Sequence, residues 1–544
     1  MITFDVLTLK AWLKEQEEFL TGSRISKIQQ PTRREFIFAL RNNGETRQFY
    51  VNINPQFYHC CFVTKQTYAE RLLEIPTQPP MFCMLLRKYL ESSKIARVNQ
   101  PENERILEFF IETYNEVGDV IELCLAFEFM GKYSNVILYN TDTDIILGCA
   151  HNVGTEKSRE REIYGSLPYV YPPKQLKNNI YNYCGEFDYK TASDDFYMIS
   201  KSFANLCQNC TTNEVKNYLK LENLTPAISR DYKTYSLYST LLPKLNETLA
   251  SVNEMIDKYY SHYIAKEKFS VLKTKYSSIV SQKLKKANKA LKQIEYKMLT
   301  DSKADKYRLY GDLLMANLYN LKDYSNSVNV YDYENNKYID IKLDNLKTIK
   351  DNANNFYKLY NKAKTAKVKL TELYEDYHSK KVYFEQLLYS INFAESIEDL
   401  FEISDEIEEN KPDKSKNKKS QISEIKRFEP DEQTTIYVGK NNKQNDYIIS
   451  KIANENDLWF HVKDNAGSHV LLKTNTVTDD LILRCAKLAK EYSSVKNSSK
   501  IGIIYTKRKY IRKPPAANLG YVTYKNEKEI ILDWYKKRQM LILW

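Results

Sequence analysis

Residues 284–298 read LKKANKALKQIEYKM, and their apolar side chains recur at alternating intervals of three and four residues. This heptad spacing is typical of a helix that packs along a second helix in a coiled coil. The same spacing occurs earlier, at 245–263, and again at 363–391. Two arms separated by about sixty residues predict an antiparallel coiled-coil hairpin within 241–409, with a small module at its tip near 300–350. A long helical rod for dimerisation is the alternative that this pattern leaves open.

The segment before the arms mixes strands and helices. FIFAL (36–40) and FYVNI (49–53) have the composition of β-strands and flank a turn-rich stretch. PPMFCMLLRKYLESS (79–93) begins with two prolines and continues with apolar residues at helical spacing, as at a helix start. Strand character returns at 103–139. Residues 1–174 are therefore predicted to form an α+β domain.

Three further segments complete the predicted organisation, which makes the chain a multidomain α+β protein. Residues 175–240 are expected to be a helical segment. Residues 410–427 are rich in Lys, Asn and Ser and predict a flexible linker. Residues 428–544 contain several short strands around a helix near 478–493, which predicts a compact α+β terminal domain.

Positive charge is concentrated in this last domain. The whole chain has 81 Lys and Arg against 70 Asp and Glu, whereas residues 428–544 alone have 20 against 13. Within them YTKRKYIRK (505–513) interleaves five basic residues with Tyr505 and Tyr510. Cations neutralise phosphates and aromatic rings stack on exposed bases, so this mixture favours RNA binding. A basic strand edge that deters aggregation would have a similar sequence.

The stretch WFHVKDNAGSH (459–469) has the residue types of an active site, but its geometry argues against catalysis. Ser468 and His469 are adjacent, and neighbouring strand residues point to opposite faces of a sheet. A reactive Ser–His pair needs proximity in space and a third, orienting group. If 464–467 form a four-residue turn, His461 and His469 lie on opposite faces; a three-residue turn brings both onto one face. We expect a binding surface and no catalytic residue here.

Other chemistry finds no support in the sequence. Six His residues are scattered without a metal-binding motif, and no phosphate-binding glycine motif is present, so no metal or cofactor is expected. The nine Cys lack a framework spacing, and the Cys207–Cys210 pair has no second pair, which predicts reduced thiols in a cytosolic protein. The N-terminus has no basic region before its apolar residues, and no run of 18 apolar residues occurs. We expect a cytoplasmic protein with no membrane partner.

Six motifs, spread in order over nearly the whole chain, resemble those of the NFACT family. They are PPMFCMLLRKYL (79–90), NERIL (103–107), EFMGKYSNVIL (128–138), YVGKNNKQND (437–446), WFHVKDNAGSHV (459–470) and RKYIRKPPAANLGYVTY (508–524). The resemblance implies an N-terminal NFACT-N domain similar to that of MutM-type DNA glycosylases, a helix-hairpin-helix-like segment, a coiled-coil hairpin and an RNA-binding NFACT-R domain. Those glycosylases use an N-terminal proline as nucleophile, whereas this chain begins Met-Ile-Thr.

The function that the resemblance implies is ribosome-associated quality control. Family members bind large ribosomal subunits obstructed by peptidyl-tRNA, and bacterial members recruit alanyl-tRNA for alanine tailing of the stalled chain without mRNA. The peptidyl-transferase centre of the subunit would make the bonds, so the protein would not itself be an enzyme. Implied partners are the ribosomal stalk base, through the coiled coil, and a small S4-domain RNA-binding protein. The alternative function is a surface-exposed fibronectin-binding adhesin.

The resemblance also implies particular contact residues. For tRNA they are Glu104, Arg105, Glu128, Phe129, Met130, Gly131 and Lys132. Glu stands at 104 where the family pattern has Asp, and Phe stands at 129 where it has an aliphatic residue, which would add stacking on a base. In 185–240 the only glycine is Gly185, although helix-hairpin-helix motifs use glycines for close phosphate approach. In the terminal domain the expected RNA- or ribosome-binding residues are Lys440, Asn441, Trp459, His461, Lys463, His469, Lys507, Arg508, Lys509, Arg512 and Lys513.

Overall fold

The computed structural model describes residues 4–71, 73, 75–114, 118–156, 160–243, 245–300, 304–408, 423–515, 517–533 and 542–543. The chain divides into two compact units, residues 1–268 and 269–544. Both units contain helices and a large sheet, which confirms the mixed α+β class. Of the linker predicted at 410–427, residues 410–422 lie outside the described residues.

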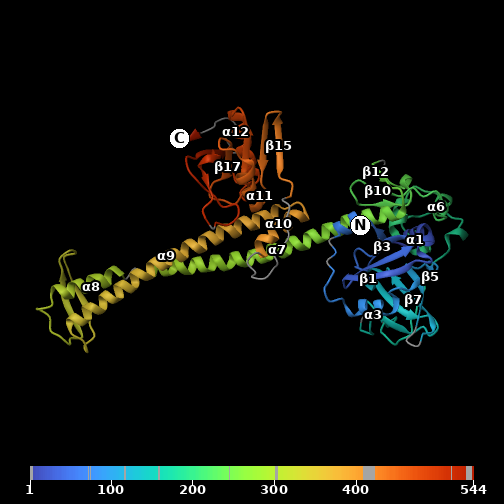
Figure 1. Ribbon diagram of the computed structural model, residues 1–544, viewed down its shortest axis with the longest axis horizontal. Helices are drawn as coiled ribbons and strands as arrows, with labels where there is room; N and C mark the ends of the chain where they lie inside the picture. Colours follow the sequence, from blue (N-terminus) through green and yellow to red (C-terminus); the bar gives the residue numbers. More distant parts are fainter. Residues whose placement is uncertain are drawn as a thin grey trace. The chain divides into compact units, whose positions relative to one another are not determined.

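The first unit is built on a nine-stranded antiparallel sheet with strand order β4-β3-β2-β1-β5-β6-β7-β8-β9 (Figure 1). Its central strands are buried on both faces; Phe36 through Leu40 of β2, for example, are all buried. The strands are β1 (Arg24–Thr32), β2 (Glu35–Asn42), β3 (Glu45–Asn52), β4 (His59–Val63), β5 (Lys94–Asn99), β6 (Ile106–Tyr114), β7 (Val120–Glu128), β8 (Asn135–Asn140) and β9 (Ile146–Cys149).

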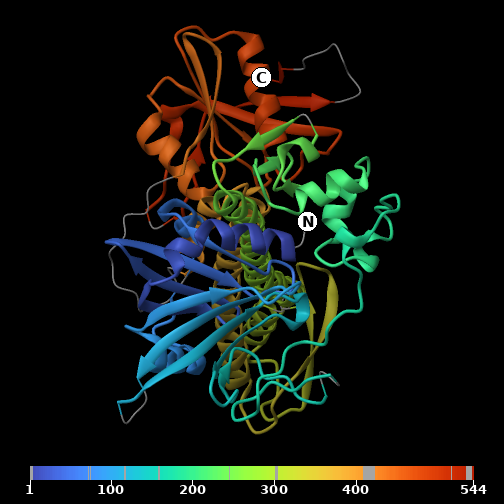
Figure 2. The ribbon, with the colours of Figure 1, turned by 90° about the vertical axis from the view of Figure 1, so that its right-hand side faces the viewer.

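Three helices join this sheet: α1 (Val6–Leu20), α2 (Lys65–Glu70) and α3 (Met81–Leu90). Figure 2 shows α1 lying across the strands, where its buried residues share one core with the sheet. The Asp5 side chain accepts from the Thr8 N–H at 2.8 Å and so caps the start of α1. Helix α3 begins directly after Pro80 and has Arg87 and Lys88 in its last turn, as the sequence predicts for a helix in this segment.

Residues 175–240 contain less helix than expected. The structure has only short helices there: α4 (Ala192–Asp195), α5 (Lys201–Leu206) and α6 (Thr212–Tyr218). Strand β10 (Ala227–Ser229) pairs with both β11 (Tyr235–Ser236) and β12 (Asn246–Thr248) in a small sheet of order β11-β10-β12. Ser200 and Thr211 each cap the start of a new helix. Because helix starts follow one another closely here, each helix is short.

From Val252 on, the heptad pattern falls on two long helices, α7 (Val252–Thr300) and α9 (Ile349–Phe393). Its first two positions, Leu245 and Leu249, precede α7 and flank strand β12, so the helix begins later than the pattern predicts. Along the part of α7 in the second unit, Tyr276 and Val280 share a buried cluster with Leu387 and Ile391 of α9, and the two helices run side by side (Figure 1). Between them in sequence come α8 (Ala304–Ala316) and a hairpin of β13 (Ser327–Asp332) and β14 (Lys337–Lys342), which pack on the start of α9. Helix α10 (Ile397–Glu408) follows α9.

The terminal domain has a seven-stranded antiparallel sheet of order β15-β16-β18-β17-β19-β22-β23. Leu458, Phe460 and Val462 of β17 pack under helix α12, whereas Trp459 packs with Ile504 on the opposite face. The elements are β15 (Lys426–Asp431), β16 (Thr434–Val438), α11 (Asn442–Tyr447), β17 (Leu458–Val462), β18 (Val470–Thr474), α12 (Asp479–Glu491), β19 (Lys500–Lys507), β20 (Ile511–Arg512), β21 (Thr523–Tyr524), β22 (Lys528–Asp533) and β23 (Ile542–Leu543).

Candidate nucleic-acid interface

The two N-terminal motifs meet at one edge of the sheet in the first unit. Residues 104–105 directly precede β6, and residues 128–132 end β7 and enter a short 3-10 turn. Because β6 and β7 are antiparallel neighbours, the start of one lies beside the end of the other. The Phe129 N–H donates to the Arg105 carbonyl at 2.9 Å. The structure therefore brings together two motifs that lie more than twenty residues apart in the sequence.

The accessible cations at this edge are Arg105 and Lys132. Arg105 is half-buried, and its guanidinium donates to the Tyr58 hydroxyl at 3.1 Å, while Lys132 is exposed. Gly131 has φ +62°, a conformation that L side chains rarely adopt. Glu104 is half-buried too; burial raises the pKa of its carboxyl, and the charge of Arg105 opposes that rise. This set suits contact with phosphates from Arg105 and Lys132.

Glu128 does not offer its carboxylate to a ligand. The residue is fully buried, its Oε2 pairs with the Arg161 guanidinium, and its Oε1 accepts from the Tyr169 hydroxyl at 3.0 Å. Burial raises the pKa of this carboxyl, and Arg161 opposes the rise. The expectation that Glu128 faces tRNA is therefore corrected, because both oxygens are already bound inside the domain. Glu128 holds the end of β7 in place.

The neighbouring apolar residues are part of the core. Phe129 is fully buried and packs edge-on against Phe4 at a centroid distance of 5.3 Å, so the expected stacking of Phe129 on a base is wrong for this arrangement. Met130 is half-buried beside a second core cluster, and its N–H donates to the Ser134 hydroxyl at 2.9 Å. These two residues position the turn that carries Gly131 and Lys132.

Sequence reasoning missed three residues of this site, Tyr58, Arg161 and Tyr169. Tyr58 is 47 residues before its partner Arg105, and Arg161 is 33 residues after Glu128. Neither lies in a recognisable motif. A buried acid in the sequence implies a partner, but nothing in the sequence says which of the many Arg residues it is.

In the terminal domain, the structure resolves the register of the hairpin at 459–469. Trp459 pairs with Leu471 and Phe460 with Val470. In this register His461 and His469 lie across from each other, with both side chains on the same face of the sheet. Their rings are perpendicular at a centroid distance of 5.3 Å. The alternative with a four-residue turn, which separates the histidines, is wrong. The connection is also longer than either turn considered, because strand pairing ends at Phe460 and Val470.

The hairpin residues are less available than expected. Trp459 and His469 are buried, with exposures of 1% and 3%, and only His461 is half-buried. Burial lowers the pKa of His461 and, well below its usual value, that of His469, so both rings are neutral near pH 7. Lys463 is exposed and pairs with Glu529 at 2.6 Å. Trp459 and His469 are thus not surface contacts.

Lys440 and Asn441 face helix α10. The Lys440 ammonium lies 3.6 Å from a carboxylate oxygen of Asp399, and the buried Asn441 amide donates to Glu402 at 2.6 Å. Asn441 also caps α11 by accepting from the Gln444 N–H at 2.9 Å. The expectation that these two side chains face RNA is corrected, because acidic groups of α10 occupy that side of the loop.

The basic stretch keeps three exposed cations at Lys507, Lys509 and Arg512. Lys513 is also exposed but pairs with Asp446 at 2.5 Å. Arg508 differs, since its guanidinium donates to the carbonyls of Ile449 and Ile511 at 2.7 and 3.1 Å and so holds the turn. The exposed cations form the surface of this domain best suited to phosphates.

Within the described ranges, no group of three or more His, Cys, Asp or Glu side chains is arranged to hold a metal ion. Across the same residues, no helix is both long and apolar enough to cross a membrane.

Comparison with known proteins matches this arrangement. A model of the NFACT N-terminal and middle domains matches residues 5–212 and 189–424, and a model of the NFACT protein RNA binding domain matches 425–526. The protein named Rqc2 homolog RqcH from Bacillus subtilis is 30% identical over 98% of both chains. Its namesake from Streptococcus pneumoniae is 28% identical over 97% of both chains.

Among solved structures, the N-terminal part of a fibronectin/fibrinogen-binding protein from Streptococcus suis covers 48% of this chain and 100% of its own, with 26% identity and a TM-score of 0.42. A likeness at that TM-score supports no conclusion about function. The sequence matches define a multidomain protein with an RNA-binding terminal domain. The chain belongs to the NFACT family, and its kinship with Rqc2 homologues implies a part in ribosome quality control.

Proposed function

We propose that this protein binds large ribosomal subunits obstructed by peptidyl-tRNA and recruits alanyl-tRNA for alanine tailing of the stalled chain, which marks the chain for degradation. The observation that carries the proposal is the match to Rqc2 homologues along 97–98% of the chain, with the RNA-binding domain included. The protein would work in the cytoplasm, associated with ribosomes.

The two surfaces would divide the work. In the first unit, Arg105 and Lys132 would contact tRNA phosphates, with Tyr58 orienting the Arg105 guanidinium. In the second, the exposed cations Lys507, Lys509 and Arg512 would contact ribosomal RNA. The peptidyl-transferase centre of the subunit would form each peptide bond, so the protein would supply positioning and no catalytic group. The long α7–α9 region would reach the stalk base, and a small S4-domain protein would assist.

The test compares the wild-type chain with Arg105→Ala in cells that lack the native protein. Under translational stalling, the wild type should sediment with large subunits in a sucrose gradient, and mass spectrometry should detect alanine tails. Arg105→Ala should keep sedimentation but lose tRNA from the purified complex and lose tails. Arg41→Ala, an exposed arginine on β2, is the matched control and should behave as wild type.

Two outcomes would contradict the proposal. One is absence of the wild-type chain from large-subunit fractions during stalling. The other is normal tailing by Arg105→Ala, which would remove the tRNA assignment. Recovery of the chain mainly on the cell surface, bound to fibronectin, would favour the adhesin alternative.

A further inference from the structure

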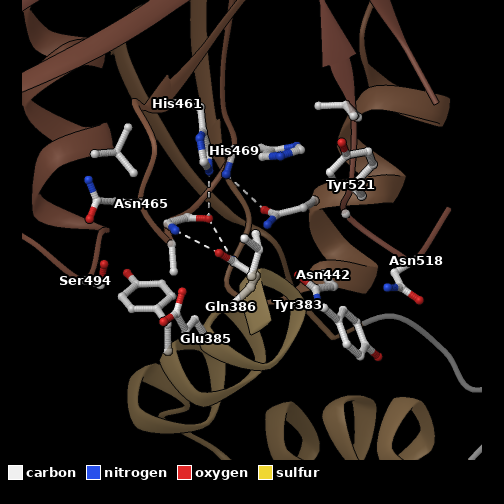
Figure 3. A pocket seen from close by; sticks show the side chains of 18 of the residues that line it. Tyr383, Glu385, Gln386, Asn442, His461, Asn465, His469, Ser494, Asn518 and Tyr521 are labelled. Atoms are coloured by element: carbon white, nitrogen blue, oxygen red, sulfur yellow. Dashed lines mark hydrogen bonds between the residues drawn. The ribbon is translucent and has the colours of Figure 1, made fainter. Parts of the chain in front are cut away.

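A cavity of about 1330 Å³ opens beside the hairpin of the terminal domain, and no role assigned above uses it. Its walls come from the C-terminal part of α9, from the connection between β17 and β18, and from the loop that follows the basic stretch (Figure 3). The inner part is buried and includes Trp459, His469 and Asn445, whereas Lys496 and Tyr521 at the mouth are exposed. The inner end of the cavity is therefore buried, whereas its mouth is open to solvent.

The inner end is aromatic and uncharged. The Trp459 and His461 rings are parallel within 2° at a centroid distance of 5.7 Å. The His469 ring stands perpendicular to both, 5.2 Å from Trp459. Because burial lowers the pKa of both histidines, neither carries charge near pH 7. A phosphate or carboxylate would gain little here, whereas a planar uncharged heterocycle would fit.

Two buried polar atoms at this end have no hydrogen-bond partner within the described part of the chain: Trp459 Nε1 and His469 Nδ1. Indole Nε1–H only donates. In a neutral imidazole one ring nitrogen donates and the other accepts, so His469 Nδ1 offers one hydrogen-bonding position. Leaving such atoms unpaired in a protein interior is unfavourable, so each requires an explanation. The indole donor and the imidazole nitrogen belong to rings 5.2 Å apart, and such a pair suits the hydrogen-bonding groups at the edge of a nucleobase.

The Tyr524 side chain packs at this edge. Its half-buried ring packs over Trp459 at a centroid distance of 5.7 Å, and Trp459 Nε1 and His469 Nδ1 are closed to water. A base that reaches these atoms therefore has to displace the side chains that cover them, and the Tyr524 ring is placed to stack on it.

The location favours RNA as the occupant. One wall is formed by residues 514–515, 517–522 and 524, which come soon after the exposed cations at 507–512 in the sequence. The wall is therefore continuous in sequence with the surface that would hold an RNA strand. Lys496 is exposed among the lining residues and can meet the phosphate of a nucleotide whose base is inside, whereas Lys381 pairs with Glu385 at 3.9 Å.

We propose that this cavity binds one unpaired nucleobase of RNA, with the base edge bonded to Trp459 Nε1 and His469 Nδ1 and the attached phosphate beside Lys496. The proposal rests on RNA binding by the terminal domain, which is part of the function proposed above. It adds a preference for single-stranded or looped RNA, because a base inside a duplex cannot enter.

The experiment measures binding of the full chain to a mixed-sequence single-stranded RNA and to a blunt-ended RNA duplex of the same sequence without a loop, which should bind more weakly. Ultraviolet crosslinking and mass spectrometry should place the single strand on peptides that contain 459–469 and 521–524. Trp459→Phe keeps a ring and removes the donor, and Lys496→Ala changes an exposed residue that cannot affect the core. Each should weaken binding of the single strand roughly 10-fold. Lys500→Ala, an exposed lysine outside the cavity, should change binding less than twofold.

Equal affinity of wild type, Trp459→Phe and Lys496→Ala for the single strand would overturn the proposal, as would crosslinks confined to residues outside the cavity. The outcome is separable from that of the proposed function. Cavity crosslinks in a protein that never joins large subunits would uphold the base site and refute the ribosomal role. Normal alanine tailing together with unchanged RNA affinity of the cavity variants would uphold the ribosomal role and refute the base site.

Discussion

Removing the partner of Glu128 should destabilise the candidate tRNA edge in a pH-dependent way. Arg161→Met leaves a fully buried carboxylate without its cation, since the side chains of Glu128 and Arg161 are only 0% and 12% exposed. Breaking a buried ion pair by removing one partner costs about 3–5 kcal/mol. Because about 1.4 kcal/mol is a factor of ten, amide exchange of β7 through local opening should accelerate roughly a hundredfold or more at pH 7.

The pH dependence follows from the carboxyl. Burial already raises the pKa of Glu128 above its usual value of 4.5, and Arg161 opposes that rise. Without Arg161 the pKa rises further. A carboxyl with a raised folded pKa contributes stability below its unfolded pKa and loses it as pH rises through the folded pKa. The deficit of Arg161→Met should therefore be small near pH 4.5 and grow toward pH 7.

Hydrogen exchange of the full chain, followed by mass spectrometry of peptides from β6 and β7, measures this effect. Arg97→Met is the matched control on the same sheet, because its pair with Glu122, at 3.1 Å, has side chains 54% and 32% exposed. An exposed pair of this kind contributes about 0–1 kcal/mol. Exchange in Arg161→Met equal to that in Arg97→Met, or independent of pH, would refute the role given to the buried pair.

Three further changes test other parts of the structure. Arg71→Met breaks the buried ion pair with Asp257, at 2.7 Å, and should lower the free energy of unfolding of the first unit by about 3–5 kcal/mol in chemical denaturation. An unchanged free energy of unfolding would show that the pair is dispensable. Gly467→Ala places a Cβ 2.9 Å from Val462 Cγ1 and should cost the terminal domain about 1–3 kcal/mol; an unchanged midpoint would show that the hairpin yields freely. The pKa of His469 is well below 6.5, so the neutral ring contributes to the free energy of unfolding above pH 6.5. That contribution is lost as pH falls, by up to about 1.4 kcal/mol per pH unit. His469→Gln should flatten the stability–pH curve by that slope, and an identical curve would exclude a buried neutral ring.

Local patterns predicted the elements that depend on local physics. Heptad spacing placed the helices now seen at 252–300 and 349–393, and strand composition placed β2 and β3, because both signals come from residues a few positions apart. The segment 175–240 was predicted less well. Its packing depends on distant partners, such as the Ser200 hydroxyl that donates to the Asp5 carboxylate at 2.5 Å. No window of sequence contains both residues.

The hairpin at 459–469 shows why the register could not be chosen from sequence. Gln386 of α9 bonds both to the N–H and to the carbonyl of Gly467, at 2.9 and 2.8 Å, from 81 residues away. The His469 N–H donates to Asn445 Oδ1 at 3.0 Å. These contacts shape the connection between the strands, and they are tertiary. Turn rules for isolated hairpins weigh only the residues inside the turn.

The family motifs contain both buried residues that hold the fold and exposed cations that can contact RNA. Glu128, Phe129 and Asn441 are buried and bonded inside the protein, whereas Lys132 and Lys507 are exposed. Loss of RNA binding after a change at a buried residue therefore does not show contact with RNA. The salt dependence of binding distinguishes the two kinds, since each phosphate contact contributes about one to the slope of log affinity against log salt. Lys507→Ala should lower that slope, whereas a buried variant such as Asn441→Ala should weaken binding with the slope unchanged. If Asn441→Ala lowered the slope as well, residues 440–441 would have to leave α10 and meet a phosphate when RNA binds.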